Sequence, residues 1–268
     1  HSIAAQVIAE NQVKNISLIH KYSTDLTIPE DIPARVDLIV SEILDSGVFG
    51  EQILETLMHA KESLLTKNGK IVPWKVCIFV AGYNSTQLCS SHIITNDTFH
   101  EYFYANKLRL VAKSNEPYDA EYVDSIKDFR IITDTRETLE VDFNSLESME
   151  KHFDGKIVKN FELHCEFEDE CSEHLDGFVT WFELYLNEND EDNKISTKPN
   201  SGSCWNQAIF KLKERVLVKK NQVIKLSMSC KDGMLTINHT LDEKSKKTDV
   251  KVDPFILKFL NDEEYLDN

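Results

Sequence analysis

Residues 36–55 read VDLIVSEILDSGVFGEQILE, and this stretch decides how the beginning of the chain is expected to fold. Its first five residues, 36–40, form an apolar run that is typical of a buried parallel strand. The apolar side chains that follow recur at the spacing of one helical face: Ile53, Leu54, Leu57, Ala60 and Leu64. Asn68-Gly69 is expected to cap that helix at its C-terminus. The pattern predicts that residues 1–72 are part of an open α/β domain.

Two carboxylates flank the loop between that strand and that helix. Glu42 follows the strand, Glu51 is expected to open the helix, and Gly47 and Gly50 permit a tight connection. Ligands of open α/β sheets bind at the carboxyl ends of the strands, so both carboxylates are candidates for one site. A structural interpretation competes with this, because a glutamate in a first helical turn is favoured by the helix dipole and Glu42 could be a cap or a solvated residue.

The remaining elements change in character at Pro73. Before it, residues 3–8 predict a helix and residues 16–20 a short strand. After it, short apolar runs separated by turn residues predict an antiparallel β-sandwich or barrel over 73–241. These runs are residues 76–81, 139–143, 161–167, 178–186, 209–212, 223–229 and 234–238. The polar and aromatic stretch 86–127 fits a helical insertion, and 242–268 fits a linker or tail.

Composition narrows the classes of partner. The 268 residues carry a net charge of −16, which disfavours a nucleic-acid partner and suits a cationic one such as an arginine-rich peptide, although it could also serve solubility alone. No apolar run approaches the ~18 residues of a membrane span. Six cysteines lack a framework spacing, so reduced thiols are expected, in a protein located in the cytoplasm and in addition in the nucleus.

One group of residue types suits zinc, namely His164, Cys165, Cys171 and His174. Their spacing matches no standard zinc finger, and in an alternating strand His164 and Cys165 point to opposite faces. Ordinary strand and loop positions therefore explain these residues better, and no metal is expected.

Four motifs in order along the chain resemble the protein arginine methyltransferase family. They are the paired glutamates of 36–55, the Ile71-Val72-Pro73 step, the strand DGFVTWFELYL followed by the turn ISTKP, and the loop SCWNQAIF. The Cys-Trp-x-Gln-Ala form of that loop is most similar to the ninth subfamily, and within it to the first of two methyltransferase modules.

The resemblance implies a Rossmann-like methyltransferase domain followed by a β-barrel, with S-adenosyl-L-methionine as cofactor. By family analogy Glu42 and Glu51 are catalytic residues that hold a substrate guanidinium, and Trp205 and Cys204 line the arginine pocket. Trp205 could instead be a barrel-core aromatic. Ser23 and Thr24 lie where the family contacts adenine. The family's usual histidine is Cys204 here, which favours monomethyl and symmetric dimethyl products.

The same resemblance also implies that the natural protein is longer than this chain and indicates its partners. The chain begins HSIAAQVIAE, so we expect a longer protein in which the glycine-rich cofactor loop precedes His1, and we expect the fragment alone to be inactive. The expected substrate is an arginine-containing protein, such as a splicing factor or another RNA-binding protein. Pairing with a second methyltransferase-like module or a homodimer is expected, since 86–127 occupies the place of the family's dimerisation arm. Two alternatives remain: a non-catalytic scaffold module, and a β-rich binding domain attached to an unrelated α/β fragment.

Overall fold

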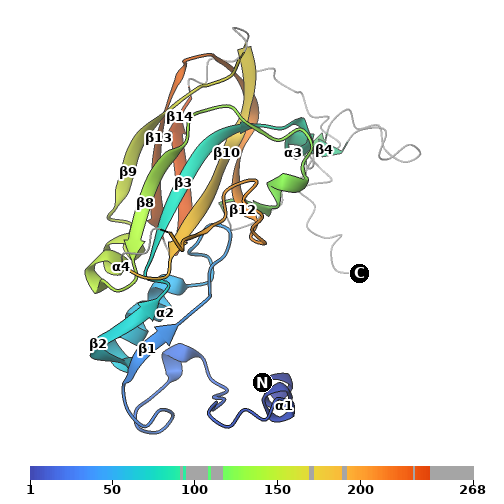
Figure 1. Cartoon of the computed structure of the whole chain (residues 1–268). Helices are drawn as coiled ribbons and strands as arrows, with labels where there is room; N and C mark the ends of the chain where they lie inside the picture. The colour runs from blue at the N-terminus through green and yellow to red at the C-terminus, as the bar shows by residue number, and fades with distance from the viewer. Residues whose placement is uncertain are drawn as a thin grey trace, which may run out of the picture.

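The computed structural model describes a chain with a small α/β part and a larger β part. In Figure 1 the two parts lie end to end, with α1 and the N-terminus at the end furthest from the large sheets. The described residues are 1–90, 93–94, 108–109, 117–168, 172–188, 192–231 and 233–241. The expected tail 242–268 lies outside them.

The α/β part is built around one pair of parallel strands, β1 and β2, with the expected helix connecting them. The helix continues from α2 into one π-helical turn, η2, and its apolar face is buried as predicted. The elements of this part are α1 (Ser2–Glu10), η1 (Ser23–Asp25), β1 (Val36–Val40), α2 (Ile53–His59), η2 (Ala60–Leu64) and β2 (Leu65–Val72).

The strand β1 is more exposed than its sequence predicts. Leu38 and Val40 are 55% and 71% exposed, whereas Val36 and Ile39 pack against the main core. The prediction of a fully buried strand was therefore wrong for the described residues. The physical reason is that β1 pairs there with β2 alone, so no second neighbouring strand covers its other edge.

Two local predictions in this part were also wrong. Asn68-Gly69 does not cap the helix, because β2 begins at Leu65 and runs through both residues while pairing with β1. The run 16–20 forms no regular strand and is exposed. In both places tertiary pairing decided the outcome over the local signal, since a strand needs a partner edge to satisfy its backbone.

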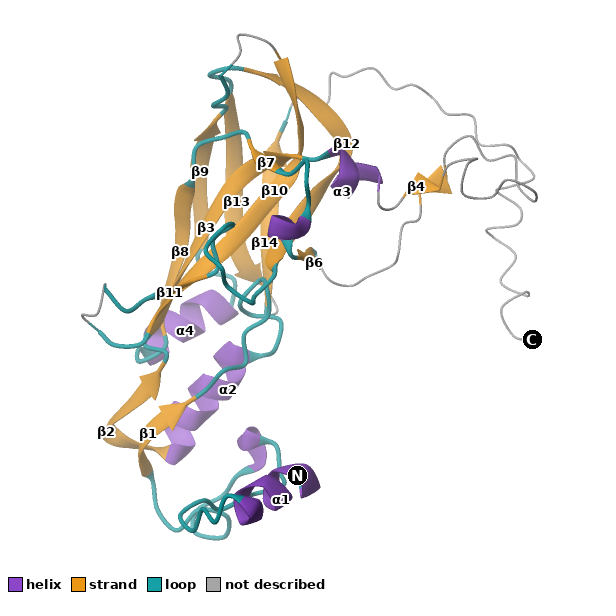
Figure 2. Cartoon of the chain, turned by 45° about the vertical axis from the view of Figure 1, so that its right-hand side comes forward, coloured by secondary structure: helices purple, strands orange, loops and turns teal. Residues whose placement is uncertain are grey.

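The β part consists mainly of antiparallel sheets, as predicted. A seven-stranded sheet has the path β6-β12-β10-β3-β7, with β11 paired to β10 and β8 to β3, and a three-stranded sheet has the order β14-β13-β9. Figure 2 shows these strands wrapping around a common interior above α4. The strands are β3 (Lys75–Asn84), β6 (Asp119–Glu121), β7 (Arg130–Ile131), β8 (Arg136–Asp142), β9 (Val158–His164), β10 (Ser172–Tyr185), β11 (Ile195–Ser196), β12 (Gln207–Lys219), β13 (Val223–Lys231) and β14 (Met234–Thr240).

The central strand of the large sheet is β10, which pairs with β3 on one edge and β12 on the other. Its residues from Leu175 to Phe182 are buried without interruption, because both faces of the sheet are covered here. Trp181 packs into a smaller cluster on one face, and Phe178 and Phe182 pack into the main core on the other. Alternation along this strand thus divides large aromatics between two apolar layers.

A short helix, α4 (Leu146–Phe153), was not predicted. It interrupts the strands between β8 and β9, and the Ser145 side chain caps it by accepting a hydrogen bond from the Ser148 backbone nitrogen. In Figure 1 it lies at the end of the β part that faces α2. The described residues of 86–127 form α3 (Thr86–Ser90), β4 (Ile93–Ile94), β5 (Leu108–Arg109), β6 and η4 (Val123–Ser125), with 117–118, 122 and 126–127 in the connections between and after them. Residues 91–92, 95–107 and 110–116 lie outside the described residues.

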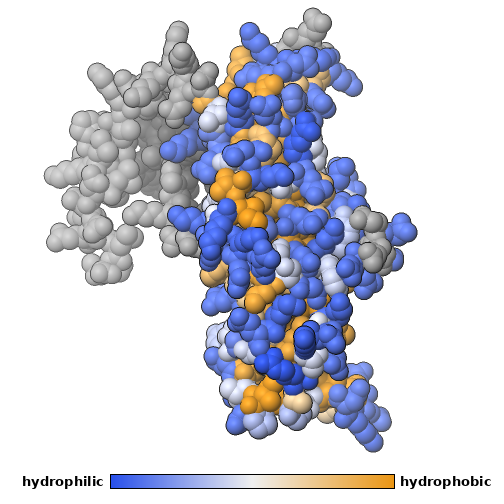
Figure 3. All heavy atoms as spheres, turned by 90° about the vertical axis from the view of Figure 1, so that its left-hand side faces the viewer, coloured by the Kyte–Doolittle hydropathy of each residue, from blue (hydrophilic) through white to orange (hydrophobic). Residues whose placement is uncertain are grey.

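Hydrophilic side chains cover most of the face drawn in Figure 3, and hydrophobic ones show only in scattered patches. Among the described residues, none of the helices has the length and apolar character needed to cross a membrane.

Candidate functional site

The loop 41–52 leaves the end of β1 and leads into α2. Its start is held by a hydrogen bond of 2.9 Å from the Ser41 nitrogen to the Val72 carbonyl of the neighbouring strand. Leu44, Val48 and Phe49 are almost completely buried in the main core. The loop is therefore anchored from the inside by apolar side chains and does not depend on surface contacts alone.

Glu42 and Glu51 are the two exposed carboxylates of this anchored loop, and Gly50 and Gln52 beside Glu51 are exposed as well. Glu42 directly follows the strand, as predicted, but Glu51 precedes the helix rather than opening it, because α2 begins at Ile53. The intervening Gln52 adopts a left-handed conformation at φ 64° and occupies the N-cap position. The helix-dipole explanation for Glu51 is weakened accordingly, since Glu51 lies outside the first helical turn.

A third carboxylate, that of Asp45, organises the loop from within. Its Oδ1 accepts a hydrogen bond of 3.0 Å from the Gly50 nitrogen, and its Oδ2 accepts one of 2.6 Å from the Tyr118 hydroxyl. Tyr118 is 5% exposed and packs its ring 5.3 Å from that of Phe210, which lies on β12. This contact ties the glutamate loop to the β part.

Trp205 lies in the loop that leads into β12. It is partly buried against the same apolar core as the glutamate loop, and its ring meets Phe182 edge-on at 6.0 Å. The buried Gln207 holds its backbone: Nε2 donates to the carbonyls of Trp205, at 3.3 Å, and Thr197, at 2.8 Å. Cys204, the preceding residue, is exposed. The structure thus places Trp205 and the glutamate loop on one core.

Ser23 and Thr24 lie in η1, which is exposed and contacts α2. Thr24 lines a groove of about 580 Å³ together with His59 of α2. Among the described residues, the buried Nδ1 of His59 has no hydrogen-bond partner. The groove also has charged side chains in its lining, those of Asp25, Arg35 and Glu62, so it suits a ligand with polar groups.

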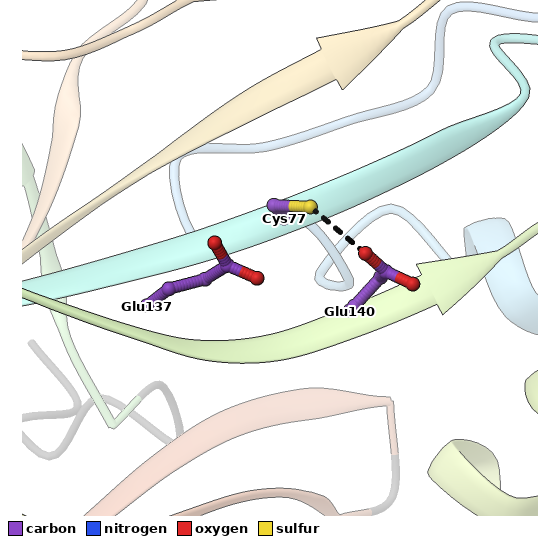
Figure 4. Close-up of side chains that lie close together, drawn as sticks. All are labelled: Cys77, Glu137 and Glu140. Atoms are coloured by element: carbon purple, nitrogen blue, oxygen red, sulfur yellow. Dashed lines mark hydrogen bonds between the residues drawn. The ribbon is translucent and has the colours of Figure 1, made fainter. Parts of the chain in front are cut away.

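The described residues contain one group with metal-ligand geometry, drawn in Figure 4: Cys77 on β3 with Glu137 and Glu140 on β8. A bulge in β8 places both glutamates on one face. The Cys77 thiol donates to Glu140 at 3.5 Å, and Lys75 lies 3.1 Å from the same carboxylate oxygen. Burial, reinforced by the neighbouring Glu137, raises the pKa of Cys77 to about 12, so the thiol stays protonated, and it shares the Glu140 carboxylate with Lys75.

The residues considered for zinc do not form a single arrangement in the described part of the chain. His164 ends β9 and Cys165 follows it, with Cys165 buried and the histidine on the other face, as the alternation predicts. His174 is exposed on β10, and Cys171 lies outside the described residues.

Comparison with known proteins shows the family to which this chain belongs. The family model described as the arginine methyltransferase oligomerization subdomain matches residues 75–244, which is more than half of the chain. The chain belongs to the protein arginine methyltransferase family. Protein arginine N-methyltransferase 9 of Xenopus laevis is 27% identical over 264 residues, which cover 89% of this chain and 31% of that protein. The human protein of the same name is 29% identical, covering 88% of this chain and 30% of its own length.

A solved structure agrees with this family membership at the level of the fold. The Trypanosoma brucei PRMT1 enzyme–prozyme heterotetrameric complex with AdoHcy matches with a TM-score of 0.61 and 19% identity, covering 85% of this chain and 69% of that one. The chain spans less than a third of the length of the two curated arginine methyltransferases.

Sequence reasoning missed three residues that shape this site: Asp45, Tyr118 and Gln207. Asp45 is recognisable afterwards as a turn-forming residue before Ser46-Gly47. Gln207 is part of the quoted loop motif, but its role depends on buried carbonyls that no local pattern reveals. Tyr118 lies 73 residues from its partner, and no sequence signal joins the two.

Proposed function

We propose that the protein containing this chain is a protein-arginine N-methyltransferase that uses S-adenosyl-L-methionine. One observation carries the proposal, namely that two exposed carboxylates, Glu42 and Glu51, belong to a loop that apolar side chains between them anchor in the core. An anchored loop can present two charges in a fixed relation, whereas a free loop cannot. Membership of the arginine methyltransferase family agrees with this interpretation.

The proposed chemistry starts from the weakness of the nucleophile. A guanidinium is fully protonated at neutral pH and its lone pairs are delocalised. Glu42 and Glu51 would bind two edges of the guanidinium, retain positive charge on the bound nitrogens and leave one nitrogen directed at the methyl group. A charge pair at ~4 Å contributes ~4 kcal/mol at an effective dielectric of about 20, before desolvation. Either carboxylate, or water beside it, would then take the released proton.

S-adenosyl-L-methionine would supply an electrophilic methyl group on a sulfonium. The residues that would hold its nucleoside are Ser23 and Thr24, because Thr24 lines the groove of about 580 Å³ and Ser23 directly precedes it in η1. A groove of this size falls within the range of small-molecule sites. The hydroxyl groups of Ser23 and Thr24 could hydrogen-bond to the cofactor, and the family neighbour solved with AdoHcy supports the same ligand class.

Trp205 would form one wall of the arginine pocket, where an aromatic face attracts a cation. The exposed Cys204 stands where the family usually has a histidine, so we propose monomethyl and symmetric dimethyl products. We also propose that residues 1–72 complete a Rossmann-like domain, that 73–241 form the barrel, and that the substrate is an arginine-containing protein of the cytoplasm or nucleus. A second methyltransferase-like module or a second copy is the proposed pairing partner.

The test measures methyl transfer from labelled S-adenosylmethionine to an arginine-rich peptide, using the natural full-length protein. Glu42→Gln and Glu51→Gln should each lower kcat by about 100-fold or more, because each removes a charge aligned with the guanidinium. The control is Glu55→Gln, an exposed glutamate on the adjoining α2, which should retain full activity. Full activity of Glu51→Gln would overturn the assigned role, and an inactive wild type that folds and binds cofactor would favour the scaffold alternative.

A further inference from the structure

Tyr118 reaches the glutamate loop from a distant part of the chain. Its hydroxyl donates a hydrogen bond of 2.6 Å to Asp45, and the other oxygen of the same carboxylate accepts from the Gly50 nitrogen at 3.0 Å. Gly50 is bonded directly to Glu51, and Asp45 stands three residues after Glu42. A single tyrosine hydroxyl therefore orients the carboxylate that connects the two halves of the loop.

The Tyr118 side chain is also packed closely against two glycines of the loop, Gly47 and Gly50. A Cβ added at Gly47 would overlap the Tyr118 ring, and one added at Gly50 would overlap the Asp45 carboxylate and lie 3.2 Å from the Tyr118 hydroxyl oxygen. These two glycines therefore provide the space that the phenol occupies. On its other side the ring packs 5.3 Å from Phe210 of β12, so the large sheet supports it from behind.

We propose that Tyr118 is a positioning residue that sets the relative placement of Glu42 and Glu51 through Asp45. This inference rests on the proposed function of the two glutamates. Hydrogen bonds to a charged acceptor are stronger and more directional than neutral ones, so this one restrains the loop where alignment matters. Tyr118 itself is buried beneath the loop and does not belong to its exposed carboxylate face.

The loop has separate anchors for folding and for alignment. Leu44, Val48 and Phe49 bury it in the core, and a change from Tyr118 to Phe leaves these contacts and the Phe210 stacking intact. Removing the hydroxyl alone therefore frees the Asp45 carboxylate without removing the apolar anchors. We expect the two glutamates to be misaligned as a result. This lowers kcat strongly and changes the folding stability and the affinity for the cofactor much less.

The experiment compares Tyr118→Phe with the wild type in the natural full-length protein. It measures kcat, the KM for an arginine-rich peptide and the KM for S-adenosylmethionine, with kcat normalised to the number of cofactor-binding sites. We expect kcat to fall about 10-fold, as for the loss of a hydrogen bond to a charged group, with the KM for S-adenosylmethionine unchanged. The matched control is Tyr122→Phe, a 40% exposed tyrosine from the same segment, which should keep wild-type kcat.

Two variants of Asp45 test whether Tyr118 positions the glutamates or only stabilises the fold. Asp45→Asn should retain most of the activity, because its amide can accept from Gly50 and donate to the tyrosine oxygen. Asp45→Ala should lose activity, and adding Tyr118→Phe to it should cause no further loss, since both act through one contact. Wild-type kcat in Tyr118→Phe, or losses that multiply in the double variant, would overturn the proposal. Activity retained in Glu42→Gln and Glu51→Gln would instead show that the proposed function itself is wrong.

Discussion

The Asp176 carboxylate and the Arg215 guanidinium form a two-point ion pair inside the β part. Arg215 Nε lies 2.6 Å from Asp176 Oδ1, and Nη2 lies 3.0 Å from Oδ2. The side chain of Asp176 is fully buried, and it also accepts a hydrogen bond of 2.8 Å from the Ser85 nitrogen. This pair joins β10 to β12 and holds the end of β3, from which the 86–127 segment departs.

Removing Arg215 should therefore be strongly destabilising. Arg215→Ala leaves a buried carboxylate without its cation, and the expected loss is about 3 kcal/mol in the free energy of unfolding. The control is Lys151→Ala, which breaks the exposed Lys151–Glu147 pair on α4 and should cost far less, because water and salt screen an exposed pair. Urea denaturation followed by circular dichroism measures both, and equal losses would contradict the distinction between buried and exposed pairs.

Two glycines should respond differently to the same substitution. Gly47→Ala places a methyl group against the Tyr118 ring, so we expect a loss of several-fold or more in methyl transfer. Gly202→Ala meets no atom within 4 Å, although its φ of 75° makes the change cost about 1 kcal/mol in stability. Kinetics and thermal melting of the two variants test this, and the prediction fails if Gly47→Ala is as active as Gly202→Ala.

The histidine on α4 should make stability depend on pH. His152 is 3% exposed, and burial lowers its pKa even though the Ser148 carbonyl accepts a hydrogen bond from its ring. The unfolded chain therefore takes up the proton first as the pH falls below about 6.5, and stability is lost from there towards the lowered pKa of the folded state.

The slope of that loss is at most about 1.4 kcal/mol per pH unit. His152→Gln should flatten it, and His174→Gln, at an exposed position on β10, should leave it in place. Unfolding free energies between pH 5 and 8 provide the measurement. A slope unchanged in His152→Gln would show that another group is responsible.

Alkylation should distinguish the cysteines. Cys204 is exposed, whereas burial raises the pKa of Cys77 to about 12 and of Cys165 to about 11. Iodoacetamide near pH 8 should therefore modify Cys204 long before the other two, because the thiolate is the reacting form. Peptide mass spectrometry over time reports the order, with urea-unfolded protein as the control in which all three react. Equal rates for Cys77 and Cys204 in the folded protein would refute the prediction.

Local sequence patterns predicted most of the elements, since each depends on neighbours only a few residues away. The helix carrying Ile53 and Leu57, most strands of the β part and the position of Glu42 at the end of a strand follow from side-chain periodicity. The ends of the strands were predicted less well. The apolar run predicts a strand that begins at Phe178, whereas β10 begins at Ser172. A strand continues as long as a partner supplies hydrogen bonds, whatever the polarity of its own residues.

The sequence by itself determined the membership of a family, the alternation of elements and the two glutamates that frame a loop. The tertiary structure alone decided how that loop is held, because Tyr118 and Asp45 meet across 73 residues of chain and the contact exists only after the sheet has formed. It also decided that Asn68-Gly69 continues a strand and that Val40 stays exposed. Periodicity records which residues prefer burial, but long-range packing determines which contacts are made.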